Sequence, residues 1–272
     1  MALTLLDGPI GTALIARNHP CPAPAWSAWA IEHAPEAVEA LHREYAAAGA
    51  EVHTTNTFRT RPDAVGPAWA DLARRAVSLA RAGAGPGQTV AGSIAPLADC
   101  YRPQDSPDNP GPRHAALAAV LADAGVDLLL CETFPHVGEA LAAVDAAVQT
   151  GCETWVSFTA GPSADLLSPE QIRQGAIAAV EQGASAVLVN CIPAGRTAEF
   201  LNPLRDLGVR FGAYANAGHT DDGIGWHPDP DGPDRYADLA EAWVKMGATI
   251  IGSCCGTGPA HIAALRARLL DS

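Results

Sequence analysis

Strand-length apolar runs alternate with segments of helical periodicity along the whole chain. In the helical segments apolar residues recur every three or four positions, as Val38, Leu41 and Tyr45 do. Eight apolar runs have the length of a strand, and a segment of this kind follows each of them. The predicted strands are Leu3–Asp7, Glu51–Phe58, Thr89–Leu97, Val126–Phe134, Thr154–Ala160, Ala186–Ile192, Val209–Gly218 and Ala248–Cys255.

The predicted strands are continuously apolar and do not alternate with polar residues. This pattern is typical of a parallel sheet that helices cover on its faces. Eight strand–helix units predict a single (β/α)8 TIM barrel, one domain over residues 1–272. An open doubly wound sheet is the alternative. It lacks support because "DGPIGT" after the first strand is not the G-x-G-x-x-G nucleotide turn.

Glycine and serine positions predict where helices begin and end. "SPEQ" at Ser168–Gln171 has the pattern of an N-cap with a capping box and proline at the first helical position. A glycine between a helical segment and the next strand is the usual left-handed cap. Six positions fit this pattern: Gly49, Gly125, Gly151, Gly183, Gly208 and Gly247.

The charge balance argues against polyanionic partners. The chain has 17 Lys and Arg against 30 Asp and Glu, a net charge of −13. A surface this acidic repels phosphate backbones and anionic lipid, so we expect neither nucleic acid nor a membrane as partner. No run approaches the roughly 18 apolar residues of a membrane span, and the N-terminus lacks a signal-peptide pattern.

The seven cysteines are irregularly spaced, which indicates reduced thiols and a cytoplasmic location. Three of them fall at the C-terminal ends of predicted strands, where TIM barrels carry their active sites. Cys191 ends the sixth strand, and Cys254 and Cys255 end the eighth.

Neighbouring side chains in a regular strand face opposite sides, so two adjacent cysteines do not normally share a ligand. Gly252 and Gly256 flank the pair and permit a bend that turns both sulfurs inward. Together with Cys191, three thiolates with one open position predict a catalytic zinc site. The alternative is that the cysteines are inert buried side chains.

Two acids directly end apolar runs. We interpret Asp7 and Glu132 as ligands for a substrate ammonium group; the alternative is that they are solvated loop acids. The turn after Asp7 offers backbone N–H groups near a helix start, which suit a carboxylate. Such a site binds an amino acid through its ammonium and carboxylate groups and places a soft side-chain atom next to a metal. Cys131 also ends a strand, but it can face the helical layer and is left outside the site.

On these motifs the chain resembles the homocysteine S-methyltransferase family. That family includes betaine–homocysteine methyltransferase, the S-methylmethionine-dependent enzymes and the homocysteine domain of cobalamin-dependent methionine synthase. The resemblance spans essentially the whole chain. The matching stretches, in the family's order, are "LLDGPIGTAL", "WSAWAIEHAPEAVEALHREYAAAGAEVHTTNTF", "GSIAP", "DLLLCET", "VNC", "YANAG" and "IIGSCCGT".

The resemblance implies a zinc-dependent methyl transfer to the thiol of homocysteine, giving methionine. It assigns zinc (Zn²⁺) to Cys191, Cys254 and Cys255, and catalytic roles to these cysteines and Glu132. The expected substrate-binding residues are Asp7, Gly8, Trp26, Asn56, Phe58, Glu132 and Asn216. In relatives the asparagine at the Asn216 position can occupy the metal's open position before substrate arrives. Pro9 departs from the family's D-G-G turn and removes one N–H donor near the substrate carboxylate.

A small cationic donor, S-methylmethionine or S-adenosylmethionine, is the favoured methyl source. The chain ends about one helix after the cysteine pair, which leaves no room for cobalamin or folate modules. Trp26, Trp29 and Trp226 are candidates for cation–π contacts. The acidic segment 218–234 either attracts the positive donor or is a solvated turn.

Several alternatives stay open from the sequence. Betaine or a separate corrinoid protein can serve as donor, and another thiol or a selenol as acceptor. A metal-free barrel lyase and a non-catalytic metal or redox sensor are the rivals of a different class. The oligomeric state is also open, and a homo-oligomer is possible.

Overall fold

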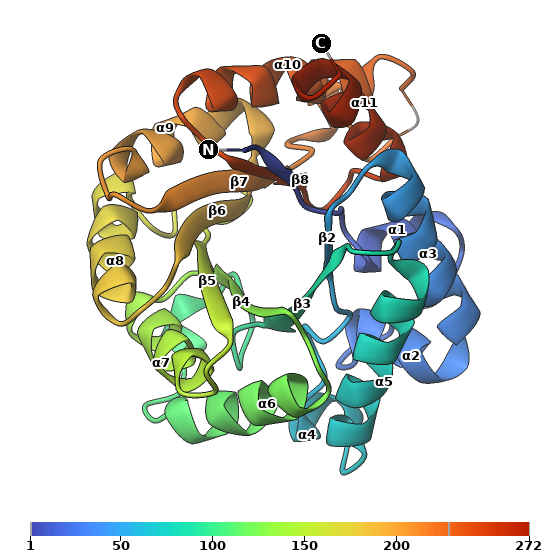
Figure 1. Ribbon diagram of the computed structural model, residues 1–272, viewed down its shortest axis with the longest axis vertical. Helices are drawn as coiled ribbons and strands as arrows, with labels where there is room; N and C mark the ends of the chain where they lie inside the picture. The colour runs from blue at the N-terminus through green and yellow to red at the C-terminus, as the bar shows by residue number, and fades with distance from the viewer. Residues whose placement is uncertain (1, 228, 272) are drawn as a thin grey trace.

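The computed structural model describes residues 2–227 and 229–271. Eight parallel strands pair in the order β1-β8-β7-β6-β5-β4-β3-β2. A parallel bridge between Leu6 and Val52 joins the two ends of this order, so the sheet closes into a ring inside a layer of helices (Figure 1). The predicted (β/α)8 barrel is confirmed.

All eight predicted strands are present, several of them shorter than the apolar run. The strands are β1 Thr4–Leu5, β2 Val52–Thr54, β3 Thr89–Ile94, β4 Leu128–Phe134, β5 Glu153–Phe158, β6 Ala186–Pro193, β7 Arg210–Asn216 and β8 Ile250–Ser253. The α-helices are α1 Gly11–Ala16, α2 Trp29–His33, α3 Pro35–Ala48, α4 Pro62–Val65, α5 Trp69–Gly83, α6 Gly111–Asp123, α7 Val137–Val148, α8 Pro169–Glu181, α9 Thr197–Leu201, α10 Gly232–Lys245 and α11 Pro259–Leu269. Short 3-10 turns are η1 Trp26–Ala28, η2 Pro103–Asp105, η3 Ala194–Arg196, η4 Asn202–Leu204 and η5 Thr220–Asp222.

The predicted helix ends are also present. Ser168 accepts from the backbone N–H of Gln171, whose side chain accepts from the backbone of Ser168 in return, which completes the capping box before α8. The six glycines proposed as left-handed caps all have positive φ, between 74° at Gly208 and 112° at Gly183. In the described part of the chain, no helix combines the length and apolar character that a membrane crossing needs.

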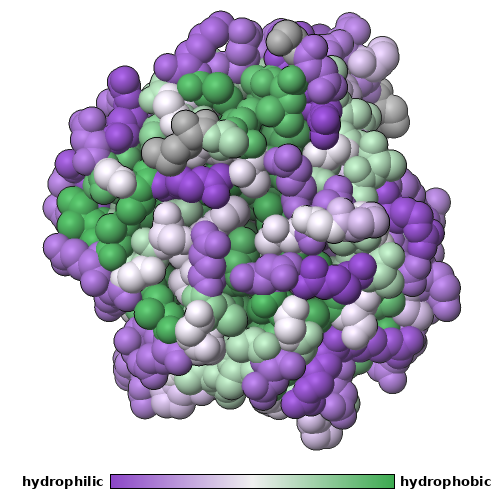
Figure 2. All heavy atoms as spheres, viewed as in Figure 1, coloured by the Kyte–Doolittle hydropathy of each residue, from purple (hydrophilic) through white to green (hydrophobic). Residues whose placement is uncertain are grey.

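Two apolar layers explain why the strands are hydrophobic on both faces. Inside the barrel, Leu128, Leu130, Leu188 and Ile250 pack with neighbours from the other strands. Outside it, a larger core fills the space between strands and helices, and Cys131 lies there, as the sequence allowed. Figure 2 shows mostly hydrophilic side chains around the rim formed by the helices, with hydrophobic and hydrophilic ones mixed toward the centre of this face.

The C-terminal ends of β4 and β6 depart from regular strand geometry. The pairing register shifts between Cys131 and Phe134 in β4 and between Asn190 and Pro193 in β6. Within these irregularities, Thr133 has φ 64° and Cys191 has φ 51°, left-handed values that non-glycine residues seldom adopt. Such conformations persist only where surrounding contacts hold them.

For Thr133, the side chain of Asn190 supplies those contacts. Its Oδ1 accepts from the Thr133 backbone N–H at 3.1 Å and from Ser157 Oγ at 2.8 Å, and its Nδ2 donates to Thr133 Oγ1 at 2.7 Å. The amide is fully buried and therefore ties the ends of three neighbouring strands together. This tie fixes the backbone on both sides of the barrel mouth, beside Glu132 and Cys191.

Candidate metal centre and active-site cavity

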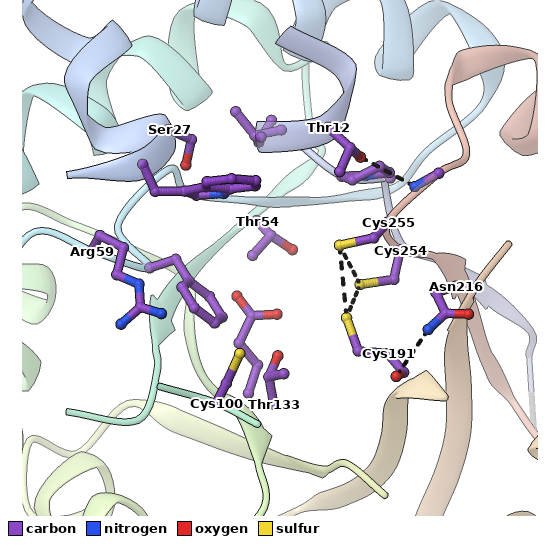
Figure 3. A pocket seen from close by; sticks show the side chains of 18 of the residues that line it. Thr12, Ser27, Thr54, Arg59, Cys100, Thr133, Cys191, Asn216, Cys254 and Cys255 are labelled. Carbon is purple, nitrogen blue, oxygen red and sulfur yellow. Dashed lines mark hydrogen bonds between the residues drawn. The ribbon is translucent and has the colours of Figure 1, made fainter. Parts of the chain in front are cut away.

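Three cysteine sulfurs meet at the C-terminal ends of β6 and β8. Cys191 Sγ lies 2.6 Å from Cys254 Sγ and 3.9 Å from Cys255 Sγ, and the last two sulfurs are 4.0 Å apart (Figure 3). All three are free cysteines. A tetrahedral zinc site with Zn–S bonds of about 2.3 Å has sulfur–sulfur edges of about 3.8 Å. Two edges match that value, and the Cys191–Cys254 edge must widen by about 1 Å to match it.

The adjacent cysteines face the same point because they lie beyond the strand. β8 ends at Ser253, and Cys254 and Cys255 form a turn whose backbone pairs with β7 and its extension, through Cys254 N to Ala215 O at 2.8 Å and Ala217 N to Cys255 O at 2.9 Å. The alternation of side chains along a strand no longer applies there. The predicted bend of the backbone is therefore present.

Gly256 completes this turn. It has φ 83°, and an added Cβ would lie 2.7 Å from the ring of Trp226 and 2.8 Å from Ala217. Both the backbone conformation and the space require glycine. The backbone N–H of Gly256 donates to Thr12 Oγ1 at 3.2 Å, which ties the cysteine turn to α1 (Figure 3).

The charge state of the cluster suits a cation. Hydrogen bonding from Cys191 and then Cys254 lowers the pKa of Cys255 well below its usual range, whereas sharing a hydrogen bond with Cys191 raises the pKa of Cys254. Negative charge thus collects on one sulfur with two more beside it. Three converging thiols are the soft ligand set that zinc prefers, and a bound cation deprotonates such thiols outright. The residues present therefore fit a metal ion.

A cavity of about 950 Å³ opens above the sulfurs. This volume is within the usual range of small-molecule sites, about 300–1,000 Å³. Every site residue expected from the sequence lines it: Asp7, Gly8, Trp26, Asn56, Phe58, Glu132, Cys191, Asn216, Cys254 and Cys255.

The structure bears on two points about the donor side that the sequence left open. Trp29 is not in the cavity wall, because its ring stacks on His33 with centroids 4.0 Å apart. From the segment 218–234, Trp226 is the one described residue that lines the cavity, and none of the segment's acids does. Instead Asp222 accepts from the backbone of His219 at 2.8 Å and Asp229 pairs with Arg235. These two carboxylates are engaged by neighbouring protein groups and lie outside the cavity wall.

Glu132 is a buried carboxyl at the cavity wall. Ser93 Oγ donates to Oε1, and Tyr214 Oη donates to Oε2 at 3.2 Å. Burial raises the pKa of Glu132 to about 7. The Ser93 hydrogen bond opposes this shift, and the electrostatic interaction with Cys191 adds to it. A carboxyl held in this way gains most from a cationic ligand, because an ammonium group compensates the cost of burying its charge.

Asp7 is the second buried carboxyl, and burial raises its pKa well above the usual range. Its Oδ2 accepts from the Thr54 backbone N–H at 2.9 Å and lies 3.9 Å from His42 Nδ1. His42 is itself fully buried and both its ring nitrogens lack a hydrogen-bond partner. Burial and the nearby His53 lower the pKa of His42 to about 3, so His42 is neutral at pH 7 and forms no ion pair with Asp7.

Position 8 requires glycine because neighbouring side chains lie close to its Cα. A Cβ at this position would lie 2.7 Å from Tyr45 Oη and 2.9 Å from Ser253 Oγ. Tyr45 Oη donates to Pro9 O at 2.9 Å and so holds the turn that follows β1. The turn therefore fits tightly against the strand end that precedes the cysteine pair.

The two asparagines of the predicted site hold main chain. Asn216 Nδ2 donates to Cys191 O at 3.0 Å, and its Oδ1 accepts from Gly218 N at 2.8 Å. Its oxygen is thus engaged by backbone and does not point freely at the sulfurs. Asn56 Nδ2 donates to Ser27 O at 2.8 Å, which fixes the segment that carries Trp26 over the cavity.

Sequence reasoning missed several cavity residues. Cys100 and Tyr101 come from the irregular stretch after β3, and Arg59 and Arg61 directly follow the T-N-T-F motif. Tyr214, inside β7, reaches Glu132 from the barrel interior. The first four residues follow predicted strands, and this position was the sequence signal that could have placed them in the cavity. Tyr214 carried no such signal, because an aromatic residue within an apolar strand looks like a core residue in the sequence.

Comparison with known proteins agrees with this arrangement. The sequence profile described as homocysteine S-methyltransferase matches residues 4–269. The homocysteine S-methyltransferase of Escherichia coli is 32% identical, over 98% of this chain and 95% of its own length. The S-methylmethionine–homocysteine S-methyltransferase of Pongo abelii is 30% identical, over 90% of this chain and 72% of its own.

A solved structure agrees as well. The crystal structure of the Escherichia coli homocysteine methyltransferase MmuM in its metallated form superposes with a TM-score of 0.79 at 27% identity, covering 98% of this chain and 96% of that one. With a matching profile over nearly all residues, a barrel of the same form and a cysteine cluster in its mouth, the chain belongs to the homocysteine S-methyltransferase family and is a methyltransferase.

Proposed function

We propose that this enzyme is a zinc-dependent methyltransferase that moves a methyl group from a small cationic donor to the thiol of homocysteine, giving methionine. The observation that carries the proposal is the convergence of Cys191, Cys254 and Cys255 beside the buried carboxyls of Asp7 and Glu132 in one cavity. A soft metal site beside two acids suits a substrate with a thiol at one end and an ammonium group at the other.

Cys191, Cys254 and Cys255 would hold the ion. When bound, zinc makes a thiol ligand a thiolate near neutral pH, where a free thiol with a pKa of about 8.5 is mostly protonated. The protein's own residues then position the substrate. Asp7 and Glu132 bind the ammonium group, and the N–H groups after Gly8 at the start of α1 face the carboxylate.

Methyl transfer forms one bond and breaks another. The homocysteine sulfur forms the new bond to the methyl carbon, while the methyl's bond to the donor's cationic atom breaks and leaves its electron pair there. The donor departs neutral at that atom. The protein contributes to the rate of methyl transfer mainly by aligning the two reactants in the cavity. The relative from Pongo abelii, whose name specifies S-methylmethionine, supports a sulfonium donor.

A single substitution tests the proposal. Cys255→Ala removes one of the three sulfurs, so we expect loss of bound zinc together with loss of methionine formation, while circular dichroism shows a retained barrel. Cys152→Ala is the matched control, because Cys152 lies outside the cavity. Zinc is measured by elemental analysis and methionine by mass spectrometry with homocysteine and a panel of donors. Methionine formation that persists when zinc is lost contradicts the proposal. So does active wild-type protein that contains no zinc after purification without a chelator.

A further inference from the structure

Two arginines lie in the cavity wall away from the metal centre. Arg59 and Arg61 follow β2, and Figure 3 shows Arg59 across the cavity from the three sulfurs. The Arg59 guanidinium carbon lies 5.4 Å from the centroid of the Phe58 ring, and Nη1 donates to Ala98 O at 2.9 Å. A guanidinium has five N–H donors, so most of those of Arg59 remain for a ligand.

The two arginines have unused binding capacity. Within residues 2–227 and 229–271, no Asp or Glu oxygen lies within 4.0 Å of the Arg59 nitrogens. Arg61 pairs with Asp63 through Nε at 3.1 Å, but its Nη1 is buried and has no hydrogen-bond partner. Asp63 is already shared, because Arg113 Nη2 lies 2.6 Å from its other oxygen.

The remaining acid of this wall is also engaged. Asp99 lines the cavity, and its Oδ1 accepts from the Tyr101 backbone N–H at 2.9 Å. Burial and then the neighbouring charge of Arg61 lower the pKa of Arg59, while Asp99 and Asp63 oppose this shift from outside ion-pair distance. A partly buried cation without a partner is costly, and a planar guanidinium matches a carboxylate in two parallel hydrogen bonds.

We propose, on the basis of the function proposed above, that Arg59 and Arg61 form a carboxylate-binding subsite for the methyl donor. The donor is then a zwitterion with its methyl-bearing sulfonium or ammonium at one end and a carboxylate at the other. Its cationic end points toward the sulfurs and its carboxylate toward the arginines. The rings of Phe58, Trp26 and Trp226 line the same cavity and offer faces to the cation.

The test compares two probes that differ only in the carboxylate: S-methylmethionine and its primary amide. Binding of each to zinc-loaded protein is measured by calorimetry, and methionine formation is measured in parallel. We expect Arg59→Gln to weaken binding of S-methylmethionine about 10- to 100-fold, as loss of a charge-assisted hydrogen-bond pair does. Binding of the amide changes less than about threefold, and zinc content and the KM for homocysteine are unchanged. Arg59→Lys restores part of the preference for the acid.

Arg113→Gln is the matched control, since Arg113 pairs with Asp63 outside the cavity and its loss leaves the acid-to-amide ratio unchanged. Equal binding of acid and amide by the wild type, or no binding of the acid, overturns the subsite. So does an Arg59→Gln defect that appears in the KM for homocysteine, because the arginine then serves the acceptor's carboxylate. A preserved preference for the acid without methionine formation overturns the proposed function and leaves the subsite standing.

Discussion

Asn190 offers the sharpest test of how the barrel supports its metal centre. Its side chain is fully buried, makes three hydrogen bonds to Thr133 and Ser157, and adjoins Cys191 in the chain. Asn190→Ala deletes all three bonds and leaves the Thr133 backbone N–H unpaired at a position where φ is 64°. The perturbation therefore removes the contacts that hold the left-handed Thr133 in place, at the residue that directly precedes the left-handed Cys191.

The expected loss follows from these contacts. Three hydrogen bonds contribute about 1 kcal/mol each, and an unpaired buried N–H costs about 1 kcal/mol or more. We therefore expect Asn190→Ala to lower the free energy of unfolding by about 4 kcal/mol. For a chain of this size that corresponds to a fall in Tm of roughly 8–16 °C. Because Cys191 loses its support, zinc affinity should fall about 10- to 100-fold.

Urea unfolding of the metal-free protein measures the first effect, and competition with a chromogenic chelator measures the second. Ser157→Ala is the matched control, since it removes one of the three bonds and leaves both contacts to Thr133. We expect a loss of about 1 kcal/mol and unchanged zinc affinity for the control. If Asn190→Ala is no less stable than Ser157→Ala and binds zinc as wild type does, Asn190 does not hold the strand ends as described.

The other predictions concern the acceptor side of the cavity. Because the pKa of Glu132 is raised from 4.5 to about 7, the folded carboxyl keeps its proton above pH 4.5 and the unfolded one does not. The contribution of Glu132 to the free energy of unfolding is therefore present below pH 4.5 and declines as the pH rises to about 7. Urea unfolding at several pH values measures this decline, and Glu132→Gln should abolish it. In kinetics, the wild-type KM for homocysteine should rise as the pH falls below about 7, and Glu132→Gln should give a KM about 10-fold higher at pH 8 with a flatter profile. A variant that keeps the wild-type pH dependence contradicts the role given to Glu132. Gly8→Ala places a methyl group 2.7 Å from Tyr45 Oη, so we expect a loss of about 1–3 kcal/mol in stability and a higher KM for homocysteine. Wild-type stability and KM in this variant would mean that the turn has room to move.

Local patterns in the sequence determined the architecture. Continuous apolar runs require burial on both faces, and only a parallel sheet covered by helices buries eight of them in this order. Capping signals act between residues close in the chain, which is why the Ser168 box and the six glycine ends are present where predicted. The cysteines were found in the same way, because each follows a strand and all strands of a barrel end at one mouth.

Tertiary structure decided the contacts within the mouth. The predicted strand Glu51–Phe58 extends beyond β2, which ends at Thr54. Side-chain hydroxyls take part in the pairing there: Thr55 Oγ1 accepts from Ser93 N at 3.0 Å, and Thr57 Oγ1 donates to Ser93 O at 2.7 Å. Whether an acid or arginine after a strand faces a ligand depends on partners far away in the chain. Asp222 pairs with the backbone of His219 and Asp229 with Arg235 in α10, whereas no carboxylate oxygen of the described residues lies within 4.0 Å of the Arg59 nitrogens. Such pairing is a property of the folded surface, and residue type and spacing do not encode it.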